Sequence, residues 1–199
     1  MITIGITGGI GSGKSYICKV LKQMGIPIYD CDSRAKSLYD KDLVLKREMI
    51  NLLGERIYDT PTGTIDKRYL SEIIFSDKEI LKRVNALVHP AVQQDIDYWK
   101  REQEAKGYAI VVLESAILLN SSNLMQRIDQ CLVVSAPLNM RLKRATERDL
   151  CEPEIIQKRI NTQLDDSEMC KKADYIIYND GTTHILPQIS KFIQTLESI

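Results

Sequence analysis

The chain has 199 residues, of which 27 are basic and 27 acidic, so its formal net charge at pH 7 is +0. This length suits one domain with an insertion, and the balanced charge gives no reason to expect nucleic acid or an anionic membrane as a partner. The five cysteines form no Cys-x-x-Cys pair, and no signal-like segment or membrane-length apolar run is present, so we expect a cytoplasmic protein with reduced thiols.

The N-terminal residues predict a strand, a glycine-rich loop and a helix. An apolar β-branched run over 2–6 precedes the loop, and a helical pattern of apolar residues follows it over 14–24. In this context the spacing Gly-x-x-x-x-Gly-Lys-Ser is typical of a loop that binds phosphates. Glycines allow several backbone N–H groups to face one polyphosphate, while Lys14 reaches the terminal phosphates and the Ser15 hydroxyl ligates Mg²⁺.

We therefore predict a nucleotide site, with ATP and Mg²⁺ as its ligands. The alternative is a glycine-rich turn before an ordinary amphipathic helix. The residues expected to hold the nucleotide here are Gly8, Gly9, Gly11, Ser12, Gly13, Lys14, Ser15 and Tyr16.

The remaining pattern alternates strands with helices. Further strands are expected over 26–29, 108–113, 128–135 and 175–178, and helices lie between them. Two of these helices are predicted over 77–87 and 91–105, with a break at His89-Pro90. The alternation predicts an α/β fold with a parallel five-stranded sheet, which binds ligands at the carboxyl ends of its strands.

Three carboxylates follow strands at that predicted edge. Asp32 could accept the proton of an attacking hydroxyl, or it could cap a helix that begins at Ser33, and the spacing does not separate these alternatives. Asp30 fits a supporting role or a contact with metal-bound water. Either Glu114 or Asp32 could hold a magnesium-bound water, although for Glu114 a solvent-facing position at the strand end is slightly favoured.

A basic helix is predicted over 137–149, with a partner helix over 152–163. Arg141, Arg144 and Arg148 recur at intervals of three and four residues and so share one face of the first helix. They could form a solvated surface, or a mobile lid with arginines over the γ-phosphate. Asn179-Asp180-Gly181 is either a simple turn after the last strand or a loop that contacts adenine.

Taken in order, these motifs resemble those of the dephospho-coenzyme A kinase family, and the resemblance runs nearly end to end. The motifs that carry it are Thr7 to Ser15, Asp30-Cys31-Asp32, Gly63 to Leu70, His89-Pro90, Leu142-Lys143-Arg144, Arg148-Asp149, Gln163, Ala173-Asp174 and Asn179-Asp180-Gly181. The resemblance implies ATP-dependent phosphorylation of the ribose 3′-hydroxyl of dephospho-coenzyme A, which gives coenzyme A and ADP.

The resemblance also implies a domain organisation and roles for residues. It implies a three-layer P-loop kinase core over 1–35 and 107–199, a helical lid over about 137–163 and a helical substrate-binding insertion over 36–106. Asp32 is implied as the base, and Lys14 and Arg144 as the groups that stabilise charge on the transferred phosphoryl. Other residues are assigned by ligand: Arg148, Asn179 and Gly181 to the nucleotide, and Lys36, Arg68 and His89 to the acceptor.

At several positions the chain departs from the family's pattern. Tyr16 stands where threonine is common, and Lys36 where arginine is common. Ala116-Ile117-Leu118 replaces Pro-Leu-Leu, Asn120 replaces an acidic residue and Met169 replaces a lysine. Two alternatives to the implied function stay open: a kinase that acts on another nucleoside or nucleotide hydroxyl, and a nucleotide-driven switch or binding protein.

Overall fold

The computed structural model describes residues 1–59 and 61–197, which form two compact units. The first unit combines Met1–Asp30 with Gln103–Ile199, and the second is Cys31–Glu102. The chain thus leaves the first unit directly after its second strand and returns to it before its third.

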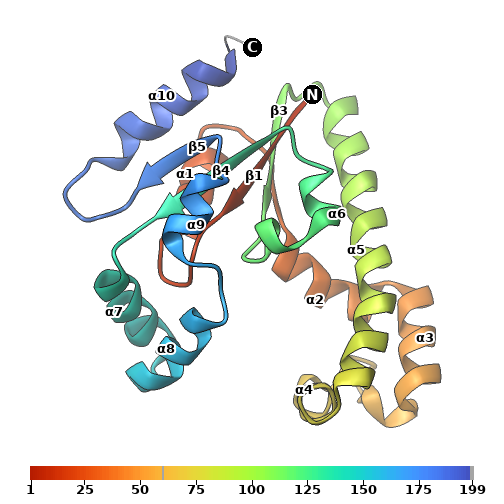
Figure 1. The fold of residues 1–199 in the computed structure, drawn as a ribbon. Helices are drawn as coiled ribbons and strands as arrows, with labels where there is room; N and C mark the ends of the chain where they lie inside the picture. The colour runs from red at the N-terminus through yellow and green to blue at the C-terminus, as the bar shows by residue number, and fades with distance from the viewer. Residues whose placement is uncertain (60, 198–199) are drawn as a thin grey trace. The chain divides into compact units, whose positions relative to one another are not determined.

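The first unit is built on a sheet of five parallel strands (Figure 1). The strands are β1 (Ile2–Thr7), β2 (Ile28–Asp30), β3 (Ile110–Glu114), β4 (Gln130–Ser135) and β5 (Tyr175–Tyr178). Their order across the sheet is β2-β3-β1-β4-β5. The predicted α/β fold with a parallel five-stranded sheet is therefore confirmed.

Two helices cover one face of this sheet. Alternate residues of β1 and β4 point to that face, where they pack against α1 (Lys14–Gln23) and α10 (Ile185–Glu197). The buried side chains of this cluster include Ile4, Ile6, Ile17, Leu21, Leu132, Val134, Ile189 and Phe192. This core fixes the position of α1, and therefore of the loop that precedes it.

Short helical segments pack near the other face. They are η2 (Leu118–Asn120), α6 (Ser122–Met125) and α9 (Asp166–Lys171). A Cβ atom at Gly5 would lie 2.6 Å from Leu118 Cδ2 and 2.7 Å from Ile128 Cδ1, so β1 needs a glycine there. The sequence pattern did not predict these segments, because helices of three to six residues are too short to show periodicity.

The carboxyl edge of the sheet carries the loop of interest. Strand β1 lies between β3 and β4, and the chain connections leave it in opposite directions, which makes this edge a topological switch point. The segment 8–13 follows β1 there, and α7 (Leu138–Asp149) and α8 (Pro153–Asn161) follow β4. Ligands of open parallel sheets bind at such points.

The second unit is helical. It contains α2 (Cys31–Lys41), α3 (Leu43–Leu53), η1 (Glu55–Ile57), α4 (Lys67–Ser76) and most of α5 (Lys78–Ala105). Side chains from α3, α4 and α5 form its core, with Met49, Leu70 and Val84 among the buried residues. Arg34 of α2 pairs with Asp95 of α5 through two hydrogen bonds of 2.7 and 2.8 Å.

The predicted break at His89-Pro90 is wrong, because α5 runs through both residues as one helix of 28 residues. Proline removes one backbone N–H from a helix, but Val84 and Val88 on the same turns are buried in the core of the unit. Burial of Val84 and Val88 thus stabilises the helix by more than the hydrogen bond lost at Pro90 destabilises it. The predicted helix start at Ser33 is also wrong, since α2 begins at Cys31.

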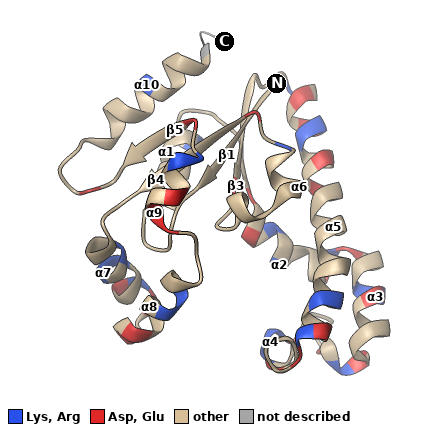
Figure 2. Cartoon of the chain, viewed as in Figure 1, with Lys and Arg blue, Asp and Glu red and all other residues tan. Residues whose placement is uncertain are grey.

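Charge is distributed without a dominant sign. In Figure 2, segments coloured for basic and for acidic residues both occur along α5, in keeping with the equal counts of the two in the chain. In the part of the chain that the structure describes, no helix has both the length and the apolar composition needed to cross a membrane.

Candidate functional site

The glycine-rich loop has the backbone conformation that only glycine adopts easily. Gly8, Gly11 and Gly13 have φ angles of 149°, 77° and 99°. Gly13 leads directly into α1, whose N-terminal N–H groups lack partners within the helix. The loop and the helix N-terminus together form the anion-binding geometry that the sequence predicts.

Close neighbours also explain why positions 9, 11 and 13 of the loop are glycine. A Cβ atom at Gly9 would overlap the guanidinium of Arg141, and one at Gly11 would overlap the Arg141 carbonyl. At Gly13 it would overlap the side-chain amide of Asn179. The outer surface of the loop is therefore packed against α7 and against the residues that follow β5.

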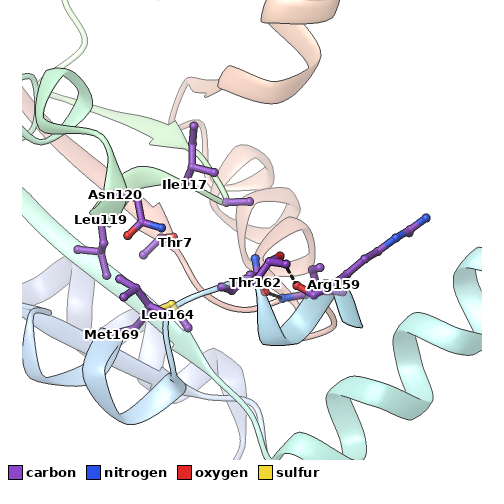
Figure 3. A pocket seen from close by; sticks show the side chains of 11 residues that line it. Thr7, Ile117, Leu119, Asn120, Arg159, Thr162, Leu164 and Met169 are labelled. Carbon is purple, nitrogen blue, oxygen red and sulfur yellow. Dashed lines mark hydrogen bonds between the residues drawn. The ribbon is translucent and has the colours of Figure 1, made fainter. Parts of the chain in front are cut away.

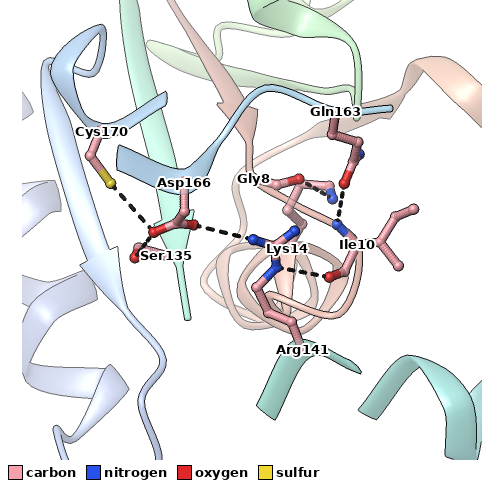
Figure 4. Close-up of polar contacts among 8 residues, drawn as sticks. All are labelled: Gly8, Ile10, Lys14, Ser135, Arg141, Gln163, Asp166 and Cys170. Atoms are coloured by element: carbon pink, nitrogen blue, oxygen red, sulfur yellow. Dashed lines mark hydrogen bonds and ion pairs between the residues drawn. The ribbon is translucent and has the colours of Figure 1, made fainter. Parts of the chain in front are cut away.

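Arg141 is a buried cation beneath the loop (Figure 4). Its Nε donates a hydrogen bond of 3.1 Å to the Ile10 carbonyl, and its Nη1 lies 3.9 Å from Asp166 Oδ1. Burial lowers the pKa of the Arg141 guanidinium from its ordinary value, while the charges of Asp166 and Asp165 act in the opposite direction. Asp166 is itself held by the Ser135 hydroxyl, which donates to it at 2.5 Å.

The other end of the predicted lid reaches the same loop residue. The Ile10 N–H donates a hydrogen bond of 2.8 Å to Gln163 Oε1 (Figure 4). Arg141 and Gln163 lie at the two ends of the segment that contains α7 and α8, so both ends are bound to the Ile10 backbone. The loop conformation is thereby linked to this helical segment.

The three arginines of α7 have different environments. Arg141 is buried, whereas Arg144 donates to the Asn179 carbonyl at 3.1 Å and to its side-chain oxygen at 3.4 Å. Arg148 is exposed and bonds Asp149, which also accepts a hydrogen bond from Arg159. Sequence periodicity placed the three on one face but could not separate these environments.

Asn179 does more than form a turn. Its side-chain Nδ2 donates to the Ser12 carbonyl at 2.8 Å, so the segment after β5 is fastened to the glycine-rich loop. Asp180 then accepts hydrogen bonds from the backbone of Thr182 and Thr183, which also lower the pKa of its carboxyl group. A pocket of about 450 Å³ lies here, lined by Tyr16, Asn179, Gly181, Thr182, Thr183, His184, Ile185, Leu186 and Pro187.

A second polar group lies where α1 meets β3. The Ser15 hydroxyl donates to Glu114 Oε1 at 3.1 Å, and Asp30 lies beside Glu114 in the register of β2 and β3. Burial raises the pKa of the nearby Cys18 thiol, and the Glu114 carboxylate raises it further. Glu114 is thus half-buried and bonded to Ser15 at a solvent-accessible strand end, and its contact with a magnesium-bound water stays a prediction.

Lys14 contacts its own loop. Its Nζ donates a hydrogen bond of 2.7 Å to the Gly8 carbonyl (Figure 4). The ammonium group is therefore folded over the loop. From this position it can interact with an anion that the loop amides bind.

The acceptor residues implied by the resemblance all lie in the second unit. Asp32 is an exposed residue in the first turn of α2 and not at the residue before the helix, so the capping alternative as stated does not fit. Lys36 and His89 are exposed on α2 and α5. Arg68 is the second residue of α4 and bonds Glu72 four residues later on the same helix.

A pocket of about 270 Å³ adjoins the loop on the side of α8 and α9 (Figure 3). Its lining includes Thr7 and Ile10, and also Asn120 and Met169. The side chains of Asn120 and Met169 are both neutral, and these are two of the positions at which the family resemblance implies a charged residue.

The residues present fit a nucleotide with magnesium. Ser12 Oγ and Arg141 Nη2 are buried polar atoms with no hydrogen-bond partner among the described residues, and both belong to the loop or its immediate support. Ser15 with Glu114 offers oxygen atoms of the kind that Mg²⁺ prefers. The described residues contain no cluster of three or more His, Cys, Asp or Glu side chains that could hold a metal.

Comparison with known proteins decides the family. A family model described as dephospho-CoA kinase (CoaE) matches residues 2–184. The chain belongs to the dephospho-CoA kinase family. A curated family member from Porphyromonas gingivalis is 38% identical to it, over 100% of this chain and 96% of that protein. Another, from Bacteroides fragilis, is 37% identical, over 98% of this chain and 93% of that protein.

Solved structures support the same fold. The protein TT1252 of Thermus thermophilus has a TM-score of 0.81 at 30% identity, with 99% of this chain and 96% of that chain covered. A dephospho-CoA kinase from Campylobacter jejuni has a TM-score of 0.69 at 23% identity, with 98% of this chain and 95% of that chain covered. A shikimate kinase from Bacteroides thetaiotaomicron, at 14% identity and a TM-score of 0.56, covers 98% of both chains and shares the fold alone.

The contact between Gly9 and Arg141 gives a testable prediction. A methyl group at Gly9 overlaps a buried guanidinium, and overpacking of this kind costs about 1–3 kcal/mol. We expect Gly9→Ala to weaken ATP binding by about tenfold in isothermal titration calorimetry. In an Arg141→Ala background the same substitution should cost much less, because the obstruction is gone. Equal losses in both backgrounds would contradict the proposed contact.

Proposed function

We propose that this protein transfers the γ-phosphoryl group of ATP to the ribose 3′-hydroxyl of dephospho-CoA, which yields CoA and ADP. The observation that carries the proposal is the phosphate loop with Lys14 and Ser15 at the switch point of a parallel sheet, in a chain that belongs to the dephospho-CoA kinase family. The product is the cofactor CoA, so the reaction is the last step of its synthesis.

The first unit would hold the donor. Loop amides from Gly11 to Ser15 would bind the β- and γ-phosphates, and Lys14 would neutralise charge that develops on the transferred group. Arg144 bonds Asn179, which in turn bonds the Ser12 carbonyl of the loop, and Arg144 is therefore suited to a further contact with the nucleotide. Arg148, exposed at the end of α7, would approach the phosphates through movement of the predicted lid.

Ser15 is suited to ligate Mg²⁺, and Glu114, with Asp30 beside it, to bind a water molecule of that ion. When bound, the ion would supply positive charge that stabilises the phosphate groups leaving as part of ADP. The hydrogen bond from Ser15 to Glu114 already brings the two oxygens within 3.1 Å. The residues for this role are therefore supplied by α1, β2 and β3.

The second unit would supply the acceptor side. We assign Asp32 as the group that accepts the proton of the 3′-hydroxyl while the oxygen attacks the γ-phosphorus. The bond from that phosphorus to the β,γ-bridging oxygen breaks, and the charge of the leaving group stays on ADP. Lys36, Arg68 and His89 are exposed on three helices of this unit and are proposed to bind dephospho-CoA.

The location of the reaction is also a proposal. The five cysteines are all free thiols in the structure, which suits the reducing cytoplasm. ATP and dephospho-CoA are small molecules, and no further partner is needed for the proposed reaction.

Coupled ADP release tests the function directly. With ATP and Mg²⁺ present, addition of dephospho-CoA should raise ADP release by at least about a hundredfold over the rate without acceptor, because positioned acceptors outcompete water at a kinase site. The product should comigrate with CoA. Stimulation by shikimate, nucleosides or nucleotides in place of dephospho-CoA would favour another kinase activity, and acceptor-independent turnover would favour a nucleotide-driven switch.

Substitution of Asp32 tests the proposed base. We expect Asp32→Asn to lower kcat by about 10²–10⁴-fold, the usual contribution of a general base. The dissociation constant for ATP should stay within about threefold, since the donor site belongs to the first unit. Glu79→Gln is the matched control, because Glu79 is likewise an exposed carboxylate in the first turn of a helix. Near-normal turnover of Asp32→Asn would exclude the base assignment.

Substitution of Glu114 tests the magnesium site. Glu114→Gln keeps an oxygen for the Ser15 hydroxyl but removes the negative charge, so the Mg²⁺ concentration for half-maximal rate should rise by about tenfold. At saturating Mg²⁺ the rate should recover to within about threefold of the original. Glu104→Gln, on the exposed surface of α5, serves as the control. An unchanged Mg²⁺ requirement would remove Glu114 from the site.

A further inference from the structure

Tyr16 is an exposed aromatic residue in the wall of a pocket beside the phosphate loop. It follows Ser15 directly, in the first turn of α1, and its relative exposure is 53%. The remaining lining of this pocket comes from Asn179 and from residues 181–187. Tyr16 is thus the next residue in the chain after the predicted phosphate-binding loop.

The pocket is fixed to the loop by specific contacts. Asn179 bonds the Ser12 carbonyl, and its amide lies where a Cβ atom of Gly13 would be. The hydroxyls of Thr182 and Thr183 bond Asp180 at 3.0 and 2.9 Å, in addition to the two backbone hydrogen bonds, so four hydrogen bonds to one carboxylate hold the segment beyond Asn179. A ligand in this pocket therefore meets a preformed wall.

The composition of the wall suits a flat, largely apolar group. Tyr16 lies with Ile185, Leu186 and Pro187 around the pocket, and Leu186 is 60% exposed. Exposed large apolar residues gathered at a pocket usually mark a binding surface. The volume of about 450 Å³ lies in the range of pockets that hold small molecules and is sufficient for a nucleoside.

The position of the pocket identifies which part of a ligand reaches it. A nucleotide with its terminal phosphates on the loop has its nucleoside on the far side of the α-phosphate, near the N-terminus of α1. Tyr16 and the segment after β5 border that region. The pocket on the side of α8 and α9 does not include Tyr16 and borders the start of the loop instead.

We propose that the Tyr16 ring packs against the nucleoside of bound ATP and thereby sets the affinity for the donor. The proposal rests on the proposed function in that ATP is taken as the donor. A threonine at this position could not make such a contact, because it has no ring. In this chain the ring therefore adds a binding contribution specific to the nucleoside and independent of the phosphates.

The experiment compares ATP with inorganic tripolyphosphate, which carries the phosphates without the nucleoside. Base stacking on an aromatic side chain contributes enough that alanine substitution typically weakens binding by about 5- to 150-fold. We expect Tyr16→Ala and Tyr16→Thr to weaken binding of Mg²⁺-ATP by about tenfold in calorimetry. Tyr16→Phe should stay within about twofold, because the ring and not the hydroxyl makes the contact. Binding of Mg²⁺-tripolyphosphate should be the same in all four proteins.

Two controls separate this effect from damage to the helix. Alanine favours helices more than tyrosine does, so Tyr16→Ala leaves α1 intact. Tyr98→Ala removes a similarly exposed tyrosine, at 57%, from α5 of the other unit and should change neither ligand's binding. In steady-state kinetics, Tyr16→Ala should raise KM for ATP by about tenfold while kcat and KM for dephospho-CoA stay within about twofold.

Two results would overturn the proposal: ATP binding within about twofold of the original in Tyr16→Ala, or an equal loss for ATP and tripolyphosphate. The proposed function fails separately. If ATP binds in a Tyr16-dependent manner but dephospho-CoA is not phosphorylated, the acceptor is wrong and the nucleoside contact stands. If dephospho-CoA is phosphorylated with unchanged KM for ATP in Tyr16→Ala, only the role of Tyr16 is wrong.

Discussion

The buried guanidinium of Arg141 is the group on which the arrangement of the phosphate loop depends. It occupies the space that a side chain at Gly9 would need, and it bonds the carbonyl of Ile10. Burying a cation is costly, and here the cost is offset by Asp166, which the Ser135 hydroxyl supports. Burial lowers the pKa of Arg141, but an arginine starts high enough to keep its charge at neutral pH. A fixed positive charge therefore lies under a loop that binds anions.

This arrangement constrains how the predicted lid can move. Arg141 bonds the Ile10 carbonyl and Gln163 bonds the Ile10 N–H, so the segment between them is attached at both ends to one loop residue. We expect movement in the chain segment between these two contacts, at the end of α7 and the start of α8. The exposed cluster of Arg148, Asp149 and Arg159 lies in that part. Its charges are held by ion pairs between exposed groups, which contribute little to stability and can be exchanged for phosphate contacts.

The sequence predicted the first strand, the loop and α1 well because their signals are local. Glycine spacing, a β-branched run and helical periodicity all fall within 24 residues, and the resulting family resemblance is confirmed by a match over residues 2–184. The environment of Arg141 could not be predicted in this way, since Ile10 and Asp166 lie 131 and 25 positions away and arginine is normally exposed. A local signal existed in Ala145, which shares the buried face one turn later. The break expected at Pro90 was wrong for a related reason, because packing of Val84 and Val88 is not a local property.

In the proposed magnesium site, the hydrogen bond between Ser15 and Glu114 would orient the hydroxyl oxygen as a ligand atom. By donating its proton to the carboxylate, the hydroxyl turns its oxygen lone pairs away from Glu114, which is the orientation that a metal ligand requires. Asp30 lies beside Glu114 in the sheet register, so negative charge is concentrated behind the hydroxyl. That charge also contributes to the raised pKa of the buried Cys18 thiol, although burial is the larger cause. A cation in front of Ser15 would relieve this concentration of negative charge, so magnesium binding and the stability of this edge of the sheet are expected to be coupled.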